Sequence, residues 1–192
     1  GRYIGSASWD MTWRLWDVET QTSLVEQDGH AQPLTSVAFQ GDGSLAVTTS
    51  LDASALLWDL RRGRAIMTLS GHLKGVLCAD FHPDGYHVAT GSADNTIRIW
   101  DLRKRETQQT IPAHAKIVRA VRYQPGNGLI LASASYDRTC RLWNAARDYA
   151  PLATLAGHEH NVMGVDVSAD GRTYVSAAYD RTFKIWRPAE VQ

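Results

Sequence analysis

The stretch SYDRTCRLWN (135–144) is followed by a near copy, AYDRTFKIWR (178–187), which begins 43 residues later. Tyr, Asp, Arg, Thr and Trp occupy matching positions in the two copies. A chain that repeats a motif at such a distance is built from structural units of about that length.

The Trp of this motif recurs through the chain at steps of 42 or 43 residues. An Asp precedes each Trp by six residues, and a Ser or Thr precedes each Asp by four. A His, usually after Gly, lies upstream of four of these sets. The four complete sets are His30, Thr48, Asp52 and Trp58; His72, Thr90, Asp94 and Trp100; His114, Ser133, Asp137 and Trp143; His158, Ser176, Asp180 and Trp186. A fifth, partial set at the start holds Ser6, Asp10 and Trp16.

A period near 42 with Gly-His early and Trp-Asp late resembles the WD-repeat β-propellers. The resemblance implies an all-β fold of radial blades with four strands each. In the third unit we expect strands over 76–81, 86–92, 96–101 and 107–111, separated by turns.

The two ends of the chain differ from the middle. The first unit has no upstream Gly-His strand, and the last has no outer strand after its Trp. We therefore expect residues 1–192 to be the C-terminal part of one propeller, about four and a half blades of a seven-bladed ring, with units ending near Trp16, Trp58, Trp100, Trp143 and Trp186. A closed five-bladed ring is the alternative.

The repeated His, hydroxyl, Asp and Trp have two interpretations. Ser, His and Asp are the residue types of a hydrolase triad, but a set that recurs in every unit does not mark a single nucleophile. The same groups form a hydrogen-bond chain in which Asp accepts from His, His bonds the hydroxyl and the hydroxyl accepts from the indole. We interpret these tetrads as structural, the role that the resemblance also gives them, and expect no catalytic residue.

Composition and missing motifs exclude several functions. Lys plus Arg and Asp plus Glu are 20 each, so the zero net charge disfavours a globally basic nucleic-acid binder. Apolar runs are too short to span a bilayer, and Cys78 and Cys140 lie in strand-like runs that predict buried free thiols of a reducing compartment. Phosphate-loop, His-Glu-x-x-His and Cys-x-x-Cys motifs are absent. The sequence HEH (158–160) offers His160 as a metal ligand, but we expect it to face solvent or a partner. No cofactor, metal, membrane or small-molecule substrate is expected.

Longer stretches of the sequence resemble one particular group of WD-repeat proteins. DGYHVATGSADNTIRIWDLRKR (84–105), TIPAH (110–114) and PLATLAGHEHNVMGVDVSADG (151–171) are similar to the pre-mRNA-processing factor four family, WD-repeat subunits of the U4/U6 spliceosomal particle. VTTSLDASALLWD (47–59) and NAARDYAP (144–151) depart from that pattern. The resemblance implies a nuclear, non-catalytic scaffold of the U4/U6 snRNP and the tri-snRNP, with other snRNP proteins as partners and snRNA nearby.

The tetrapeptide WDLR, at 58–61 and 100–103, supports an alternative. It resembles the box with which some propellers dock onto the adaptor of the cullin-4 ubiquitin ligase. The chain would then be a substrate receptor. Solvent-exposed Arg side chains at strand ends explain the same residues.

The turn that carries each tetrad Asp indicates a partner surface. Bulky aromatic residues precede that Asp in three units, and Arg follows it in two. Exposed aromatic and Arg side chains are typical interface anchors. We expect the partner-binding residues to be Trp9, Tyr136, Arg138, Tyr179 and Arg181, with Lys116, His160 and Asn161 from adjacent loops. Packing of Tyr and Arg against neighbouring blades is the alternative.

Overall fold

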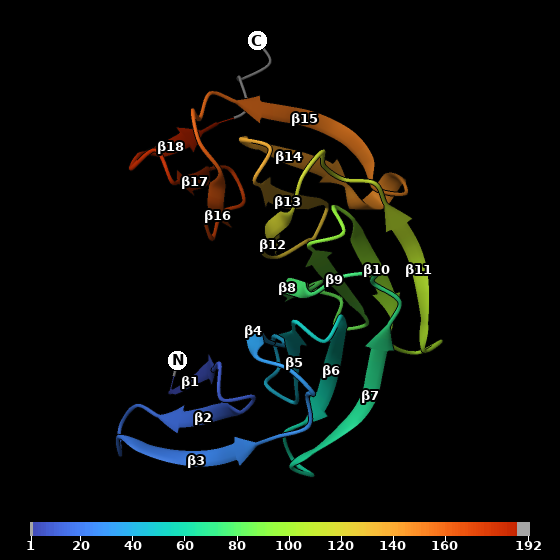
Figure 1. Ribbon diagram of the computed structural model, residues 1–192, viewed down its shortest axis with the longest axis vertical. Helices are drawn as coiled ribbons and strands as arrows, with labels where there is room; N and C mark the ends of the chain where they lie inside the picture. The colour runs from blue at the N-terminus through green and yellow to red at the C-terminus, as the bar shows by residue number, and fades with distance from the viewer. Residues whose placement is uncertain (1, 188–192) are drawn as a thin grey trace.

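A computed structural model describes residues 2–187 of the chain. In this part of the chain, eighteen β-strands form five antiparallel sheets, and there is one short 3₁₀ helix. The sheets stand in chain order along an arc (Figure 1) and are called the first to the fifth blade here. The all-β propeller architecture expected from the repeat is confirmed.

The outermost blades have three described strands each. The first blade holds β1 (Tyr3–Ala7), β2 (Trp13–Asp17) and β3 (Thr22–Gln27), and the fifth holds β16 (Val162–Val167), β17 (Tyr174–Ala178) and β18 (Phe183–Trp186).

The three blades between them have four strands each. The second blade holds β4 (Leu34–Phe39), β5 (Leu45–Ser50), β6 (Ser54–Asp59) and β7 (Arg64–Ser70). The third holds β8 (Val76–Phe81), β9 (His87–Ser92), β10 (Ile97–Asp101) and β11 (Glu106–Ile111). The fourth holds β12 (Val118–Tyr123), β13 (Ile130–Ser135), β14 (Thr139–Asn144), the 3₁₀ helix η1 (Ala145–Arg147) and β15 (Ala150–Ala156).

The strands expected in the third unit differ from the observed ones by at most one residue at each end. Burial explains their composition. β9 is buried along almost its whole length, whereas the outer β11 alternates between exposed and less exposed side chains. A strand covered on both faces takes small and β-branched residues, and an outer strand alternates in polarity.

The hydrophobic cores lie between neighbouring blades. Ile97 and Ile99 of β10 are fully buried and belong to one cluster with Val118 and Val121 of β12. Similar clusters join the first blade to the second, the second to the third and the fourth to the fifth. Each blade is therefore stabilised mainly by burying apolar area against its neighbours.

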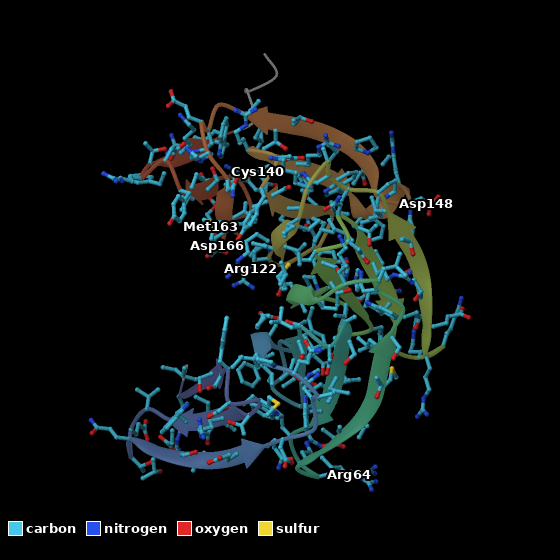
Figure 2. The ribbon with its side chains drawn as sticks, in the orientation of Figure 1. Arg64, Arg122, Cys140, Asp148, Met163 and Asp166 are labelled. Carbon is cyan, nitrogen blue, oxygen red and sulfur yellow. The ribbon has the colours of Figure 1, made fainter. Side chains whose placement is uncertain are left out.

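The innermost strands β4, β8, β12 and β16 lie side by side along the concave edge of the arc (Figure 1). Figure 2 shows Arg122 and Asp166 at this edge. Arg122 lies between two carboxylates, 3.8 Å from Asp80 and 3.7 Å from Asp166. Burial raises the pKa of Asp80 to about 6, although the Tyr123 N–H donates to its carboxylate.

The arc leaves its two ends apart: the first and fifth blades stand at opposite ends (Figure 1). The five described blades therefore do not close into a ring by themselves. No helix in the described residues is long and apolar enough to cross a bilayer. Cys78 and Cys140 are buried free thiols, as predicted, and burial raises the pKa of each to about 12.

A repeated clamp joins each inner blade to the next. The side chain after the innermost strand donates to the carbonyl of a turn glycine in the following blade. The three clamps are Gln40 to Gly85 at 3.0 Å, His82 to Gly128 at 3.2 Å and Gln124 to Gly171 at 3.0 Å. Each of these glycines has a positive φ, so the turn and the clamp depend on the same residue.

We expect Gly85→Ala to lower the free energy of unfolding by about 2–3 kcal/mol. Its φ is +75°, and a Cβ would lie 2.7 Å from the Gln40 amide nitrogen, which breaks the clamp. Gly63→Ala is the control, because Gly63 has a φ of +61° but nothing near its Cβ position. Urea unfolding of both variants measures the difference; equal losses would mean that the clamp contributes nothing.

Candidate partner-binding face

Each of the four tetrads is a continuous hydrogen-bond chain. In the third blade the His72 Nδ1–H donates to Asp94 at 2.9 Å, the Thr90 hydroxyl bonds His72 Nε2 at 2.8 Å, and the Trp100 indole N–H donates to the same hydroxyl at 2.8 Å. The other three sets of residues named above are joined in the same way. With His donating to Asp, the hydroxyl donating to His and the indole donating to the hydroxyl, each buried polar group of the tetrad has a hydrogen-bond partner.

The tetrad Asp fixes the loop and the turn on one face of the arc. Asp94 accepts from Thr96 within its own turn and from the Leu73 N–H in the loop that enters the blade. Burial opposes ionisation of Asp94, but the hydrogen bonds from Thr96, Leu73 and His72 outweigh it and lower its pKa to about 2. The face formed by these loops and turns is called the tetrad face.

We expect the free energy of unfolding to fall as the pH drops from about 7 to about 2, less steeply between about pH 6 and pH 4. Burial lowers the pKa of His72 and His114, and the pKa of Asp94 is about 2. The unfolded chain therefore takes up more protons than the folded one at these groups, first at imidazoles below about pH 6.5 and then at carboxylates below about pH 3.9. The buried Asp80, whose pKa is about 6, acts in the opposite sense between about pH 6 and pH 4, because the folded state protonates it first.

Urea unfolding monitored by Trp fluorescence across this range measures the slope. A His72→Gln variant should show a smaller slope than the parent between about pH 7 and pH 5, because one titrating imidazole is gone. Equal slopes in His72→Gln and the parent over this range would contradict the protonation state assigned to the tetrad.

The residue after each tetrad Asp has a left-handed backbone, which the sequence analysis did not predict. The φ angles at these five turns are 69° at Met11, 67° at Ala53, 71° at Asn95, 73° at Arg138 and 66° at Arg181. Among these, only Asn readily adopts this conformation. Arg138 and Arg181 are exposed at the tips of their turns, at a cost in backbone strain.

The structure brings most of the predicted partner residues together on the fourth and fifth blades. Tyr179 is 72% exposed, its N–H donates to the Asn161 carbonyl at 2.9 Å, and its ring lies 6.4 Å from that of His160. On the fourth blade, the Tyr136 N–H donates to Ile117, and the Ser135 hydroxyl donates to the Lys116 carbonyl at 3.2 Å.

The exposure of these side chains differs from one residue to the next. Tyr179, Arg138, Arg181 and Lys116 are exposed, so they do not pack inside a neighbouring blade, whereas Tyr136 is half-buried. Among the described residues, neither Arg138 nor Arg181 forms an ion pair within 4.0 Å. The turns of two adjacent blades therefore each carry an exposed Arg that forms no ion pair among the described residues, and a Tyr two residues before it.

Two further exposed apolar side chains lie on the tetrad face: Trp9, which was predicted as a partner residue, and Leu73, which was not. Trp9 is 78% exposed on the first blade, but the second and third blades separate it from Tyr136 on the fourth, so the structure does not bring these two together. Leu73 is 85% exposed on the third blade and was missed. Its position directly after the tetrad His is the signal that would have found it.

The tetrad hydroxyls are inaccessible. Thr48, Thr90 and Ser133 are completely buried and Ser176 is 1% exposed, and each accepts an indole N–H. A hydroxyl in that position has no room for an incoming carbonyl, as an acyl-transfer nucleophile needs.

The two WDLR tetrapeptides lie on the opposite face, at the ends of β6 and β10. Arg103 pairs with Asp101 at 3.4 Å and lies 4.6 Å from the centre of the Tyr86 ring. Arg61 is exposed, and its N–H donates to Asp59 at 2.9 Å.

The repeat also matches a known protein family. The model of the WD domain, G-beta repeat, matches residues 21–59, 63–101, 105–144 and 149–187. This chain belongs to the WD40 repeat family. Each match starts in or just before the outer strand of one blade and ends with the third strand of the next, so the WD40 repeats are staggered against the blades.

Curated relatives of this WD40 chain match it over short stretches. The ribosome biogenesis protein WDR12 homolog of Nematostella vectensis is 48% identical over 48 residues, 25% of this chain and 12% of the relative. The U4/U6 small nuclear ribonucleoprotein PRP4-like protein of Arabidopsis thaliana is 46% identical over 47 residues, 24% of this chain and 8% of the relative. The U4/U6 small nuclear ribonucleoprotein PRP4 of Saccharomyces cerevisiae is 62% identical over 29 residues, 15% and 6% respectively. The matched stretches thus cover an eighth of these relatives or less.

Proposed function

We propose that this WD40 chain is a non-catalytic, nuclear scaffold of the U4/U6 snRNP and the tri-snRNP in pre-mRNA splicing. The similarity to two proteins named as U4/U6 ribonucleoproteins supports this assignment. The stretches 84–105, 110–114 and 151–171, which resemble that family, also support it. The buried, fully bonded tetrad hydroxyls agree with the absence of a catalytic role.

The observation that carries the binding mode is the pair of adjacent turns on the fourth and fifth blades. Tyr179, Arg138 and Arg181 are exposed there without ion pairs among the described residues. Such groups gain affinity when a partner covers them, because aromatic area is buried and Arg donates to carboxylates. We therefore propose that another snRNP protein docks on the tetrad face, with snRNA close by.

Sequencing the RNA that co-purifies with the tagged protein from nuclear extract tests this function. Enrichment of U4 and U6 snRNA over total nuclear RNA is the expected result. Enrichment of ribosomal precursor RNA would instead indicate a role in ribosome biogenesis, the process in the name of the Nematostella relative. Recovery of cullin-4 ligase subunits without snRNA would favour the substrate-receptor alternative suggested by the WDLR tetrapeptides.

A further inference from the structure

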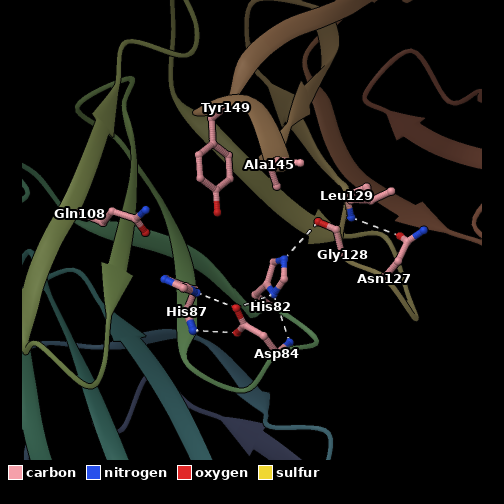
Figure 3. A pocket seen from close by; sticks show the side chains of 10 residues that line it. His82, Asp84, His87, Gln108, Asn127, Gly128, Leu129, Ala145 and Tyr149 are labelled. Atoms are coloured by element: carbon pink, nitrogen blue, oxygen red, sulfur yellow. Dashed lines mark hydrogen bonds and ion pairs between the residues drawn. The ribbon is translucent and has the colours of Figure 1, made fainter.

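Two imidazoles and a carboxylate converge at the end of the third blade, on the face opposite the tetrads. The Asp84 Oδ2 atom lies 2.7 Å from His87 Nδ1 and 3.1 Å from His82 Nδ1. The three residues line a pocket of about 260 Å³ between the third and fourth blades, which Tyr149 and Gln108 also border (Figure 3). Their side chains are 16–33% exposed, so the cluster is reached from solvent through the pocket.

The clamp fixes which nitrogen of His82 carries the proton. His82 Nε2–H donates to the Gly128 carbonyl at 3.2 Å, which leaves Nδ1 with a lone pair. That lone pair accepts the Asp84 backbone N–H at 3.1 Å and also lies 3.1 Å from the Asp84 Oδ2 atom, so a bound cation would take the place of the backbone N–H at this nitrogen. A metal-binding His usually donates its other ring N–H to a carbonyl or carboxylate in this way.

His87 also turns Nδ1 toward Asp84. Its Nδ1–H donates to Asp84 Oδ2 at 2.7 Å, and its Nε2 lies 3.9 Å from the Asp101 carboxylate, beyond hydrogen-bond distance. Metal binding through His87 Nδ1 would therefore move the ring proton to Nε2, on the side of Asp101. Zinc bonds of 2.0–2.1 Å in tetrahedral geometry place neighbouring ligands about 3.3 Å apart. The Asp84 Oδ2 atom lies 3.1 Å and 2.7 Å from the two Nδ1 atoms, and all three ligand atoms lie within 4.8 Å of one another, so small side-chain shifts would reach that geometry.

The second, fourth and fifth blades, called the sister blades here, lack both imidazoles. Gln40, Gln124 and Ser168 occupy the position of His82, and Leu45, Ile130 and Thr173 that of His87. Gln40 and Gln124 form the same clamp as His82, so the fold does not require an imidazole there.

The neighbouring loop departs from the repeat at the same pocket. The 3₁₀ helix η1 and the left-handed Asp148 and Tyr149, with φ of 47° and 52°, belong to the irregular segment 144–151. They place Tyr149 against the pocket, with its hydroxyl 2.8 Å from that of Tyr123. Backbone strain of this kind concentrates at functional sites.

We propose that His82, Asp84 and His87 bind one Zn²⁺ ion, with the remaining coordination position open toward the pocket. Two imidazoles and one carboxylate are a ligand set of zinc sites that keep an open position, which water would occupy. Mg²⁺ and Ca²⁺ prefer all-oxygen ligands and fit the site poorly. From the sequence we expected no metal ligand, because the usual metal-binding motifs are absent, and His82 and His87 were not considered.

Calorimetric titration of Zn²⁺ into the metal-free full-length protein tests the proposal. Saturable binding of one ion is expected, with a rise in melting temperature on binding. His82→Gln and His87→Leu carry the sister-blade residues and should keep the fold while weakening Zn²⁺ binding by at least about 100-fold, more than the loss of an outer partner causes. Asp84→Asn should act likewise, since Asn127 supports the matching turn of the fourth blade.

His160→Ala serves as the control, because His160 lies on the tetrad face and should leave the titration unchanged. The absence of saturable binding in the parent at micromolar Zn²⁺ would overturn the proposal. Parent-like affinity in both His82→Gln and His87→Leu would also overturn it, because the ion would then be bound elsewhere. Binding of Mg²⁺ as tight as that of Zn²⁺ would contradict the assigned ligand chemistry.

Discussion

Trp100→Ala is expected to lower the free energy of unfolding by about 2–5 kcal/mol. Trp100 is 4% exposed and packs in the core between the second and third blades. Its indole N–H also donates to the buried Thr90 hydroxyl at 2.8 Å. The substitution therefore creates a cavity and removes one partner from a buried hydrogen-bond chain.

Trp100→Phe separates these two contributions. Phe fills much of the space but has no N–H, so this variant should lose mainly the hydrogen bond, about 1–2 kcal/mol. Asp94→Ala tests the other end of the chain, because it leaves the Nδ1–H of buried His72 without its acceptor. We expect Asp94→Ala to fall in the same range as Trp100→Ala.

Chemical unfolding monitored by far-ultraviolet circular dichroism measures these differences. The fluorescence of the remaining Trp residues provides a second probe of the same transition. If Trp100→Ala and Asp94→Ala unfolded like the parent but had lost a chemical activity, the tetrads would be catalytic and the structural interpretation wrong.

The fold could be predicted from the sequence because its determinants repeat. Every blade needs the same burial and the same internal hydrogen bonds, so His, hydroxyl, Asp and Trp recur at fixed distances. The strands of the third unit, such as Val76–Phe81, follow from turn residues and alternation within that period. The clamp from Gln40 to Gly85 was not predictable, because it joins side chain to backbone across two blades and leaves no periodic signal stronger than a polar residue.

The candidate sites were only partly predictable. The exposed pair Tyr179 and Arg181 follows from the repeated motif, whereas Leu73 stands alone in its unit and was overlooked. The left-handed backbone at Arg138 could not be inferred from Arg, which disfavours that conformation. The His82 and His87 cluster depends on side-chain directions at the two ends of a turn, which sequence spacing alone does not specify.

The double variant Arg138→Glu and Arg181→Glu is expected to weaken association with the U4/U6 particle by on the order of 100-fold or more. Both Arg side chains are exposed on adjacent blades and form no ion pair among the described residues. Reversal of two charges replaces two charge-assisted hydrogen bonds with repulsion from the same acidic or phosphate group. Recovery of U4 and U6 snRNA with the tagged variant measures the loss.

The melting temperature of this double variant should stay close to that of the parent, because neither Arg is buried. Arg138→Asn with Arg181→Asn is the matched control for the backbone. Asn95 occupies the same turn position in the third blade with a φ of 71°, so Asn relieves backbone strain there. The Asn variant should therefore be at least as stable as the parent while losing association through missing charge alone.

Salt dependence identifies the group that the two Arg side chains contact. If they neutralise RNA phosphates, association of the parent should weaken steeply with rising salt, and the Asn variant should show a smaller slope. If they pair with carboxylates of a protein segment in a largely apolar interface, the slope should be shallow in both. Retention of the Glu variant in the particle would mean that the tetrad face is not the main docking surface. Unfolding of the Glu variant would mean that these side chains support the blades, because an exposed group can be reversed in charge without loss of the fold.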